Sequence, residues 1–393
     1  MAMPLRVGLV AGEASGDTLG AGLILALRHL APDAQFFGIA GPKMRAAGCE
    51  VWESSESLAV MGLFEILRDL PRLFQLRARV RRAFIAARPD VFVGIDSPEF
   101  NLRLARDLRR ANIPTVQYVS PQVWAWRQKR VRTIHESVDL VLCLLPFEKS
   151  FYDAERVPAE FVGHPLADAI PLIVDRSLAR TQLNLPADAR VVALLPGSRR
   201  GEVSRLAEDF AKTVRRLTAH RPELQFVAPM ANGAARELFA AALARLAPDV
   251  TVQLLDGQAQ AALIAADVVL VASGTASLEA ALCKRPMVVV YRLGAMTVWL
   301  LKRLNLVKAK FFAQPNLLAD RRVVGEYFGN DIVPESIATE LLMWLDDTAR
   351  REALEREFYG VHVNLKRDAS ARAAKAVFDL SNRRRLPAAE GSA

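Results

Sequence analysis

Short apolar runs rich in valine recur along the chain, and a segment with helical periodicity follows most of them. One series comprises residues 5–10, 91–95, 115–119 and 140–145, and a second comprises residues 191–195, 225–228, 251–255, 268–272 and 287–291. Continuous apolar runs of this length are typical of parallel strands that helices cover on both faces. The pattern therefore predicts an α/β fold built on parallel sheets.

The two series indicate two domains, because each begins with a strand, a glycine-containing loop and an amphipathic helix. A chain of 393 residues also exceeds one domain of about 100 to 200 residues. We expect two doubly wound, Rossmann-like domains that face each other across a central cleft. The predicted parts are a first domain at 1–168, a second domain at 169–360, a helix at 361–382 that packs back on the first domain, and a disordered tail at 383–393.

Composition narrows the classes of protein further. No stretch of about 18 residues lacks charge, which argues against a membrane-spanning helix. The first strand follows Met1 too closely for a signal peptide, so we expect a cytoplasmic protein. The net charge of +9 favours anionic partners, namely nucleic acid, phospholipid headgroups or phosphorylated substrates, but no nucleic-acid-binding module accompanies it. The three cysteines and five histidines lack metal-site spacing, so we expect buried reduced thiols, no metal and no cofactor.

The segment at 272–282 follows a strand and carries small and hydroxylated residues where a helix should begin. If Ser273 caps a helix that starts near Thr275, free N–H groups and the helix dipole form an anion site there. Thr275 and Glu279 are one helical turn apart, so a phosphate and a sugar could bind together, as in a nucleoside diphosphate. The alternative is ordinary capping, with Glu279 as a solvated charge.

The loop at 196–202 follows the first strand of the second series and carries Arg199 and Arg200. Arg199 could pair with a diphosphate, because ligands of open parallel sheets bind at the carboxyl ends of the strands. A basic turn before an amphipathic helix is the alternative. The Walker pattern of ATPases is absent.

In the first domain, Asp96 comes just after an apolar strand and Glu99 begins the next helix. A carboxylate at this position can act as a general base, although Asp96 could equally cap the helix, since Asp-Ser-Pro-Glu is a strong helix start. Glu13 and Asp17, in the loop after the first strand, are a second pair of candidate carboxylates.

The paired tryptophans at 124 and 126 also follow a strand, where they would pack against a ligand or in the core.

The stretch at 58–76 is denser in large apolar residues than a surface helix needs, and arginines follow it. Apolar side chains beside clustered cations suit the headgroup boundary of an anionic bilayer, and a buried helical hairpin is the alternative. The predicted membrane or acyl-chain contacts are Val60, Met61, Leu63, Phe64, Ile66 and Leu67.

Taken in order, these segments resemble the lipid-A-disaccharide synthases, a family of glycosyltransferases with the GT-B fold. The resemblance covers residues from about 6 to 380 and rests on the blocks GEASGD at 12–17, GIDSPEFN at 94–101, SPQVWAW at 120–126, GHP at 163–165, LPGSR at 195–199, SGTASLE at 273–279 and PNLLA at 315–319. Single blocks recur in other GT-B enzymes, whereas the ordered set is specific.

The resemblance implies an inverting, metal-independent transfer of 2,3-diacylglucosamine from UDP-2,3-diacylglucosamine to 2,3-diacylglucosamine 1-phosphate, which yields a β-1,6-linked disaccharide and UDP. The implied catalytic residues are Asp96 as general base, Glu13 as a second carboxylate, Arg199 and Asn316. The implied UDP-sugar contacts are Ser198, Arg199, Ser273, Gly274, Thr275 and Glu279. Both substrates are acylated, so the enzyme would work on the anionic cytoplasmic surface of the inner membrane. A homodimer is compatible with this interpretation.

The sequence departs from the family pattern in one loop, at Gln314, where leucine is usual, and at Gly325, where proline is common. Two alternatives remain: a UDP-N-acetylglucosamine 2-epimerase, which shares the fold and nucleotide site but needs no apolar, basic surface, and a non-catalytic sensor of nucleotide sugars. A dinucleotide oxidoreductase is disfavoured, because neither glycine-rich loop has the full GxGxxG pattern.

Overall fold

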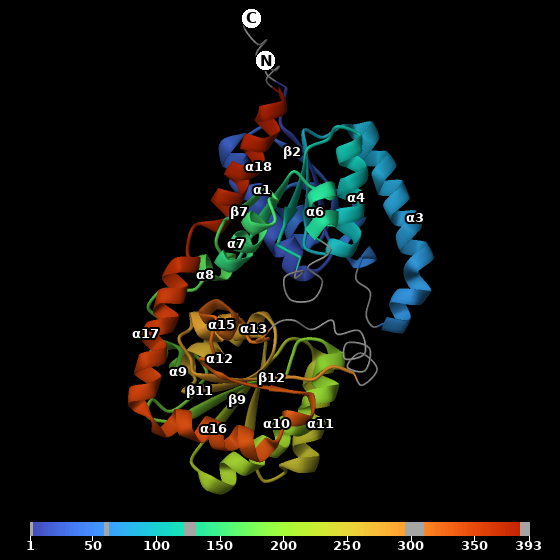
Figure 1. Ribbon diagram of the computed structural model, residues 1–393. Coiled ribbons are helices and arrows are strands. Elements are labelled where there is room, and N and C mark those ends of the chain that lie inside the picture. The colour runs from blue at the N-terminus through green and yellow to red at the C-terminus, as the bar shows by residue number, and fades with distance from the viewer. Residues whose placement is uncertain (1–2, 59–62, 122–130, 295–309, 386–393) are drawn as a thin grey trace, which may run out of the picture. The chain divides into compact units, whose positions relative to one another are not determined.

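The computed structural model describes residues 3–58, 63–121, 131–294 and 310–385, with the backbone alone described at 63–70. The chain forms two compact units, one made of Met1–Asp168 with Leu365–Ala393 and the other of Ala169–Asn364. Each unit has its own parallel sheet with helices on both faces, so the prediction of two doubly wound α/β domains is confirmed (Figure 1). Among the described residues, no helix is long and apolar enough to cross a membrane.

The sheet of the first unit has seven parallel strands in the order β3-β2-β1-β4-β5-β6-β7. The strands are β1 (Arg6–Ala11), β2 (Gln35–Ala40), β3 (Cys49–Ser54), β4 (Val91–Ile95), β5 (Thr115–Tyr118), β6 (Leu140–Cys143) and β7 (Ala159–Phe161). Strands β1 and β4 are neighbours although three helices and two strands separate them in the chain. The strand order therefore reverses between them.

Two groups of helices cover this sheet. Helix α1 packs against α2 and α18, and α4 packs against α3 and α6. The helices of the unit are α1 (Ala14–Leu30), α2 (Pro42–Ala46), α3 (Leu63–Ala87), α4 (Pro98–Arg110), α6 (Val131–Ser137), α7 (Pro146–Ala154), α8 (Pro165–Ala169) and α18 (Ala369–Arg385), with a 3₁₀ turn η1 (Ser55–Ser57). The C-terminal helix α18 lies along α1, which confirms the prediction that the end of the chain returns to the first domain (Figure 1).

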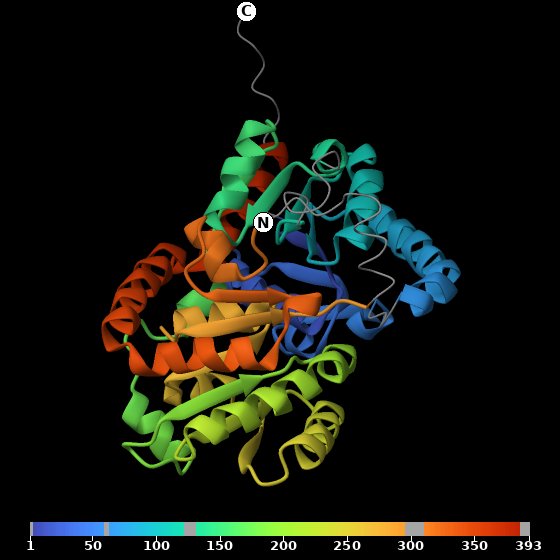
Figure 2. The ribbon, with the colours of Figure 1, turned by 60° about the horizontal axis from the view of Figure 1, so that its bottom comes forward.

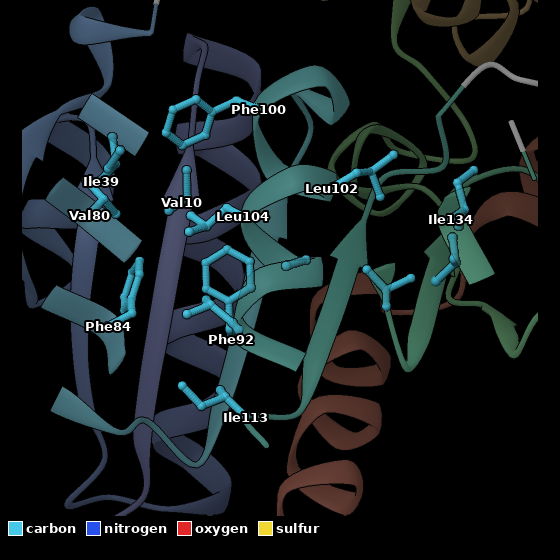
Figure 3. Packing of buried hydrophobic residues seen from close by; sticks show 14 of the residues in the cluster. Val10, Ile39, Val80, Phe84, Phe92, Phe100, Leu102, Leu104, Ile113 and Ile134 are labelled. Carbon is cyan, nitrogen blue, oxygen red and sulfur yellow. The ribbon is translucent and has the colours of Figure 1, made fainter. Parts of the chain in front are cut away.

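The core of the first unit lies between the sheet and helices α3 and α4 (Figure 3). Helix α3 contributes Leu76, Val80 and Phe84, which are four residues apart and therefore share one face. Phe84 meets Phe92 of β4 edge to face, with ring centroids 5.3 Å apart. Burial of this apolar stripe fixes α3 on the sheet, since each fully buried large side chain contributes roughly 1.5–3 kcal/mol.

The sheet of the second unit has six parallel strands in the order β10-β9-β8-β11-β12-β13. They are β8 (Val191–Leu195), β9 (Gln225–Met230), β10 (Val252–Asp256), β11 (Val268–Ala272), β12 (Met287–Tyr291) and β13 (Gly325–Phe328). The order reverses between β8 and β11. Every residue of these two strands is buried.

Helices again form two groups on this sheet, as Figures 1 and 2 show. Helix α10 packs with α11 and α16, and α12 packs with α9 and α13. The helices are α9 (Arg176–Gln182), α10 (Arg200–His220), α11 (Gly233–Leu246), α12 (Ala259–Ala265), α13 (Thr275–Leu282), α15 (Gln314–Ala319), α16 (Pro334–Asp346) and α17 (Thr348–Leu365), with a 3₁₀ turn η3 (Gly329–Asp331).

The C-terminal helix differs in its bounds from the single helix expected at 361–382. Helix α17 ends at Leu365 and α18 begins at Ala369, with Asp368 between them in the left-handed conformation (φ 56°). The carboxylate of Asp168 accepts backbone N–H groups from this break: Oδ1 from Arg367 (3.0 Å) and Asp368 (2.9 Å), and Oδ2 from Ala369 (2.7 Å). A side chain far away in the sequence therefore starts α18, a cap that local sequence patterns do not reveal.

We predict that Asp168→Ala lowers the free energy of unfolding by about 1–2 kcal/mol, the usual cost of a lost N-cap, and frees α18 for proteolysis. Urea unfolding and limited proteolysis followed by mass spectrometry measure both effects. Asp175→Ala is the matched control, because Asp175 caps α9 through Leu178 N at 2.9 Å within a single helix start. The control should lose stability without exposing α18, and equal cleavage of α18 in both variants would contradict the assignment.

Candidate active site

The predicted site residues gather at the points where the strand order reverses. In the first unit, the loops after β1 and β4 carry Glu13 and Asp96; in the second unit, the loops after β8 and β11 carry Arg199 and Thr275. Connections leave the two strands of such a pair in opposite directions, which opens a crevice at their carboxyl ends. Each unit therefore places its candidate residues where open α/β sheets bind ligands.

The loops after β1 and β4 are in direct contact. A Cβ atom on Gly12 would lie 2.0 Å from the hydroxyl of Ser97, so glycine is needed for this close approach. Asp96 and Ser97 both adopt the left-handed conformation, with φ of 54° and 42°. The N-cap residue of α4 is Ser97 and not Asp96, and the Ser97 side chain makes no capping bond.

The two carboxylates of the first loop differ in environment. Glu13 is the exposed N-cap of α1, and its side chain makes no capping bond. Asp17 is buried, and its carboxylate accepts N–H groups from Gly41 (3.0 Å), Lys43 (2.9 Å) and Met44 (3.0 Å). Asp17 thus caps α2, and the prediction that Asp17 is a candidate site carboxylate beside Glu13 is wrong, because both of its oxygens accept backbone N–H groups.

Helix α13 begins at Thr275 as expected, but its N-cap is Gly274 (φ 150°), and no side chain caps it. The predicted capping by Ser273 is wrong, because the Ser273 hydroxyl donates to Phe312 O at 3.1 Å instead. The alternative, ordinary capping of this helix by a side chain, is also wrong. The first N–H groups of α13 emerge beside the exposed residues Gly274 and Thr275, at the positive end of the helix dipole. This end of the helix can accept an anion.

Glu279 lies one turn further along α13 and is partly buried. Burial raises the pKa of its carboxyl group, since a low-dielectric surrounding disfavours the charged form. No hydrogen-bond or ion-pair partner of this carboxylate occurs among the described residues. A desolvated carboxylate beside a helix N-terminus is therefore available to a ligand that brings hydroxyl groups.

The loop after β8 is held by Glu202, whose Oε2 accepts the N–H groups of Ser198 (3.2 Å) and Arg199 (3.3 Å). Asn232 donates to Ser198 O at 3.0 Å from the opposite side. The Arg199 side chain is 61% exposed and lies 3.7 Å from Glu202 Oε1, which holds the guanidinium close to the loop. Glu202 was not among the residues expected at this site, although its place three residues after the N-cap Arg199 is the spacing of a capping box.

Asn316 is fully buried in α15. Its Oδ1 accepts from Val323 N (2.8 Å) and Val324 N (3.0 Å), and its Nδ2 donates to Val324 O (3.0 Å). Glu326 accepts the N–H groups of Phe312 and Ala313 just before this helix, at 3.1 and 2.8 Å. Asn316 therefore shapes the loop at 310–326, which also contacts Ser273.

Several predicted residues fall outside the described part of the chain. Val60, Met61 and the tryptophans at 124 and 126 are among them, and Leu63, Phe64, Ile66 and Leu67 belong to α3 where only the backbone is described. The described part of α3 packs through Leu76, Val80 and Phe84 and carries an exposed basic face of Arg72, Arg79, Arg81 and Arg82.

The three cysteines are the candidates for thiol chemistry, and His, Cys, Asp and Glu side chains are the candidate metal ligands. Cys49, Cys143 and Cys283 are free and buried, and burial raises the pKa of the Cys49 and Cys283 thiols to about 12. Thiols with such a raised pKa are poor nucleophiles at neutral pH. Within the described ranges, no group of three His, Cys, Asp or Glu side chains could hold a metal ion.

Comparison of the fold with solved structures adds a first finding. A putative UDP-N-acetylglucosamine 2-epimerase from Listeria monocytogenes aligns with a TM-score of 0.63 at 15% identity and covers 98% of both chains. The calicheamicin glycosyltransferase CalG4 aligns with a TM-score of 0.59 at 17% identity, over 97% of this chain and 99% of that one. Identities this low show the two-domain GT-B fold alone.

The sequence comparisons are more specific. A family model described as lipid-A-disaccharide synthetase matches residues 7–377. The lipid-A-disaccharide synthase of Serratia proteamaculans is 50% identical over 378 residues, which cover 96% of this chain and 98% of the relative. The enzyme of Xanthomonas campestris pv. campestris is 49% identical over 97% of this chain and 87% of its own length. The match spans both units and the returning helix α18, so the chain belongs to the lipid-A-disaccharide synthase family of glycosyltransferases.

Proposed function

We propose that this chain transfers 2,3-diacylglucosamine from UDP-2,3-diacylglucosamine to the 6-hydroxyl of 2,3-diacylglucosamine 1-phosphate, and releases UDP. The observation that carries the proposal is the identity of about half of all residues with lipid-A-disaccharide synthases along nearly the whole chain. The likeness in fold to 2-epimerases does not favour an epimerase, because it comes with only 15% identity.

The second unit would bind the donor. In support, the uncapped N-terminus of α13 and the guanidinium of Arg199 follow the adjacent strands β11 and β8, so both can meet one diphosphate. N–H groups and a guanidinium stabilise the charge that develops on the departing UDP. Glu279, one turn into α13, would accept hydrogen bonds from the ribose hydroxyls. Ser198, Ser273 and Gly274 would complete the contacts through the two loops.

The first unit would activate the acceptor. An α-linked donor that yields a β-linked product requires one displacement, with one base and no covalent intermediate. We assign the base to Asp96, which takes the proton of the 6-hydroxyl while that oxygen attacks the anomeric carbon and the bond to UDP breaks. Glu13 is the second carboxylate of this loop pair, because Gly12 packs directly on Ser97. Asn316 would act indirectly, by holding the loop whose Phe312 carbonyl accepts from Ser273.

Both proposed substrates carry acyl chains, so the enzyme has to meet them at a membrane surface. The basic face of α3 supports this, because clustered arginines attract anionic lipid headgroups by about 1 kcal/mol each, and the ion pairs of Arg79 with Glu53 and of Arg81 with Asp107 reduce that attraction. The apolar residues predicted to contact the membrane, Leu63 and Phe64 among them, would reach the acyl region. We therefore place the enzyme on the cytoplasmic face of the inner membrane.

Asp96→Asn should reduce disaccharide formation by about 100- to 10,000-fold, the usual contribution of a general base, while UDP affinity stays unchanged. UDP release from the two acylated substrates measures turnover, and titration calorimetry measures UDP binding. Asp107→Asn is the matched control, since Asp107 lies on α4, the helix that follows Asp96, and pairs with Arg81 at 3.6 Å. Full turnover of Asp96→Asn would exclude Asp96 as the base, whereas loss of UDP binding would indicate a damaged fold.

Glu279→Ala should weaken UDP binding by about 1.5–3 kcal/mol, the value of a hydrogen bond to a charged group. Calorimetry with Glu237→Ala, an exposed glutamate on α11, as control checks this. Equal UDP affinity in the Glu279 variant and the parent would mean that Glu279 does not contact the nucleotide.

The pH dependence of stability gives an independent test of the same carboxyl group. Because burial raises the pKa of folded Glu279, ionisation costs stability as the pH rises above the unfolded value of about 4.5. Glu279→Gln should therefore leave stability unchanged below that pH and increase it above the raised pKa. Urea unfolding from pH 4 to pH 8 measures the difference, and a pH-independent difference would contradict it.

Replacement of Leu63 and Phe64 by serine should reduce binding to vesicles that contain anionic phosphatidylglycerol, because the variant loses apolar surface at the headgroup boundary. Sedimentation with vesicles measures the bound fraction. The matched control replaces Ile173 and Leu178, which are 86% and 55% exposed in the second unit, by serine. If both double variants bind vesicles equally well, the stretch at 58–76 is not the membrane contact.

A further inference from the structure

Two buried side-chain amides converge on the backbone of Asp96. Asn101 of α4 donates from Nδ2 to Asp96 O at 2.8 Å, and Gln117 of β5 donates from Nε2 to the same oxygen at 3.1 Å. Both side chains are 0% exposed. The Asn101 nitrogen also lies 3.3 Å from Ile95 O, and the Gln117 nitrogen lies 3.3 Å from Val119 O. The two amides thus link the ends of β4 and β5 beneath one peptide group.

This peptide group belongs to a strained turn. Asp96 and Ser97 have φ of 54° and 42°, and Val119, at the end of the neighbouring strand, has φ of 78°. Positive φ is unusual for residues with side chains, above all for a β-branched valine, and it persists only where surrounding contacts hold it. Here the contacts are visible: Asp96 N donates to Tyr118 O at 2.9 Å, and Asp96 O receives both amides.

The oxygen atoms of the two amides differ from the nitrogen atoms in their contacts. Asn101 Oδ1 and Gln117 Oε1 are buried and have no hydrogen-bond partner among the described residues. Buried polar atoms are usually paired, so an unpaired oxygen is a cost to the fold. Only the donor half of each amide is used, and Asp96 O is the nearest acceptor of both nitrogens. A leucine or methionine of similar shape would fill the same space without this cost, but it would not hold the turn.

We propose that Asn101 and Gln117 are positioning residues, which hold the backbone of Asp96 in the left-handed conformation that the reaction requires of its carboxylate. The inference rests on the proposed role of Asp96 as general base. Without the two donors, the Asp96–Ser97 turn relaxes towards negative φ and carries the carboxylate with it. Misplacement of a catalytic group by about 1 Å costs on the order of 100-fold in rate.

The test uses the full-length protein with Asn101→Leu and Gln117→Met, which lie on different elements. Each should lower kcat by about 10- to 100-fold, with KM for the UDP-sugar and the affinity for UDP within about twofold of the parent. Thr115→Val is the matched control, because the buried Thr115 hydroxyl donates to Ser137 O (3.2 Å) at the opposite end of β5. It should lower Tm without changing kcat.

The same substitutions in an Asp96→Asn background separate positioning from general damage, since residues that act through one group are not additive. Gln117→Met should then reduce the residual rate by less than about twofold. An undiminished 10- to 100-fold loss there, or a kcat equal to the parent in both isosteric variants, overturns the proposal and leaves the base assignment intact. Full activity of Asp96→Asn alone instead removes the base, and with it this inference. If one isosteric variant does not fold, the other carries the test.

Discussion

The structure depends on a constraint of parallel sheets: the interior strands are covered by helices on both faces, so polar chemistry is confined to the strand ends. In β1, β4, β8 and β11, nearly every residue is buried and apolar. The two reversals of strand order, between β1 and β4 and between β8 and β11, are the places where the carboxyl ends stay uncovered. All the catalytic and UDP-sugar residues that we propose, apart from Asn316, follow one of these four strands, because a charge elsewhere in the sheet would be buried without compensation.

The carboxylates of the protein divide by how their oxygens are used. Asp17, Asp168, Glu202 and Glu326 each accept two or three backbone N–H groups, and each fixes a helix start or a loop. Such carboxylates are committed to the fold, since replacing their N–H donors by a ligand would break the bonds that fix the helix start or the loop. Glu279 is the contrasting case, because it is desolvated and its carboxylate keeps its acceptor capacity within the described part of the chain. By this distinction Asp17 is a structural acid of α2, whereas Glu279 keeps the acceptor capacity that our proposal for the donor site requires.

Sequence patterns predicted the buried strands well, because continuous valine-rich runs have few other uses. They missed β2, β3, β7 and β13. Gly38 interrupts β2, and β3 alternates polar and apolar residues at the sheet edge, whereas β7 and β13 are short and each carries a glutamate. The loops of the site were predictable, since they follow strands that were recognised. The hydrogen bonds of Ser273, the capping of α2 by Asp17 and of α18 by Asp168, and the two amides beneath Asp96 were not, because their partners are distant in the sequence or are backbone atoms.

The two departures from the family pattern, Gln314 and Gly325, also have a place in this scheme. Gly325 begins β13 and pairs with Val288, three residues before the carboxyl end of β12 at Tyr291. A Cβ atom there would lie 2.3 Å from the carboxylate of Glu340, which accepts from the Tyr327 hydroxyl at 2.7 Å. Glycine at 325 thus accompanies a partly buried tyrosine–glutamate pair at the sheet edge. Gln314 is the first residue of α15. Glu326 accepts the N–H groups of Phe312 and Ala313, the two residues that precede it. The departure at 325 is therefore a local packing solution, and β12 separates β13 from the strands β8 and β11 at whose carboxyl ends we propose that the donor binds.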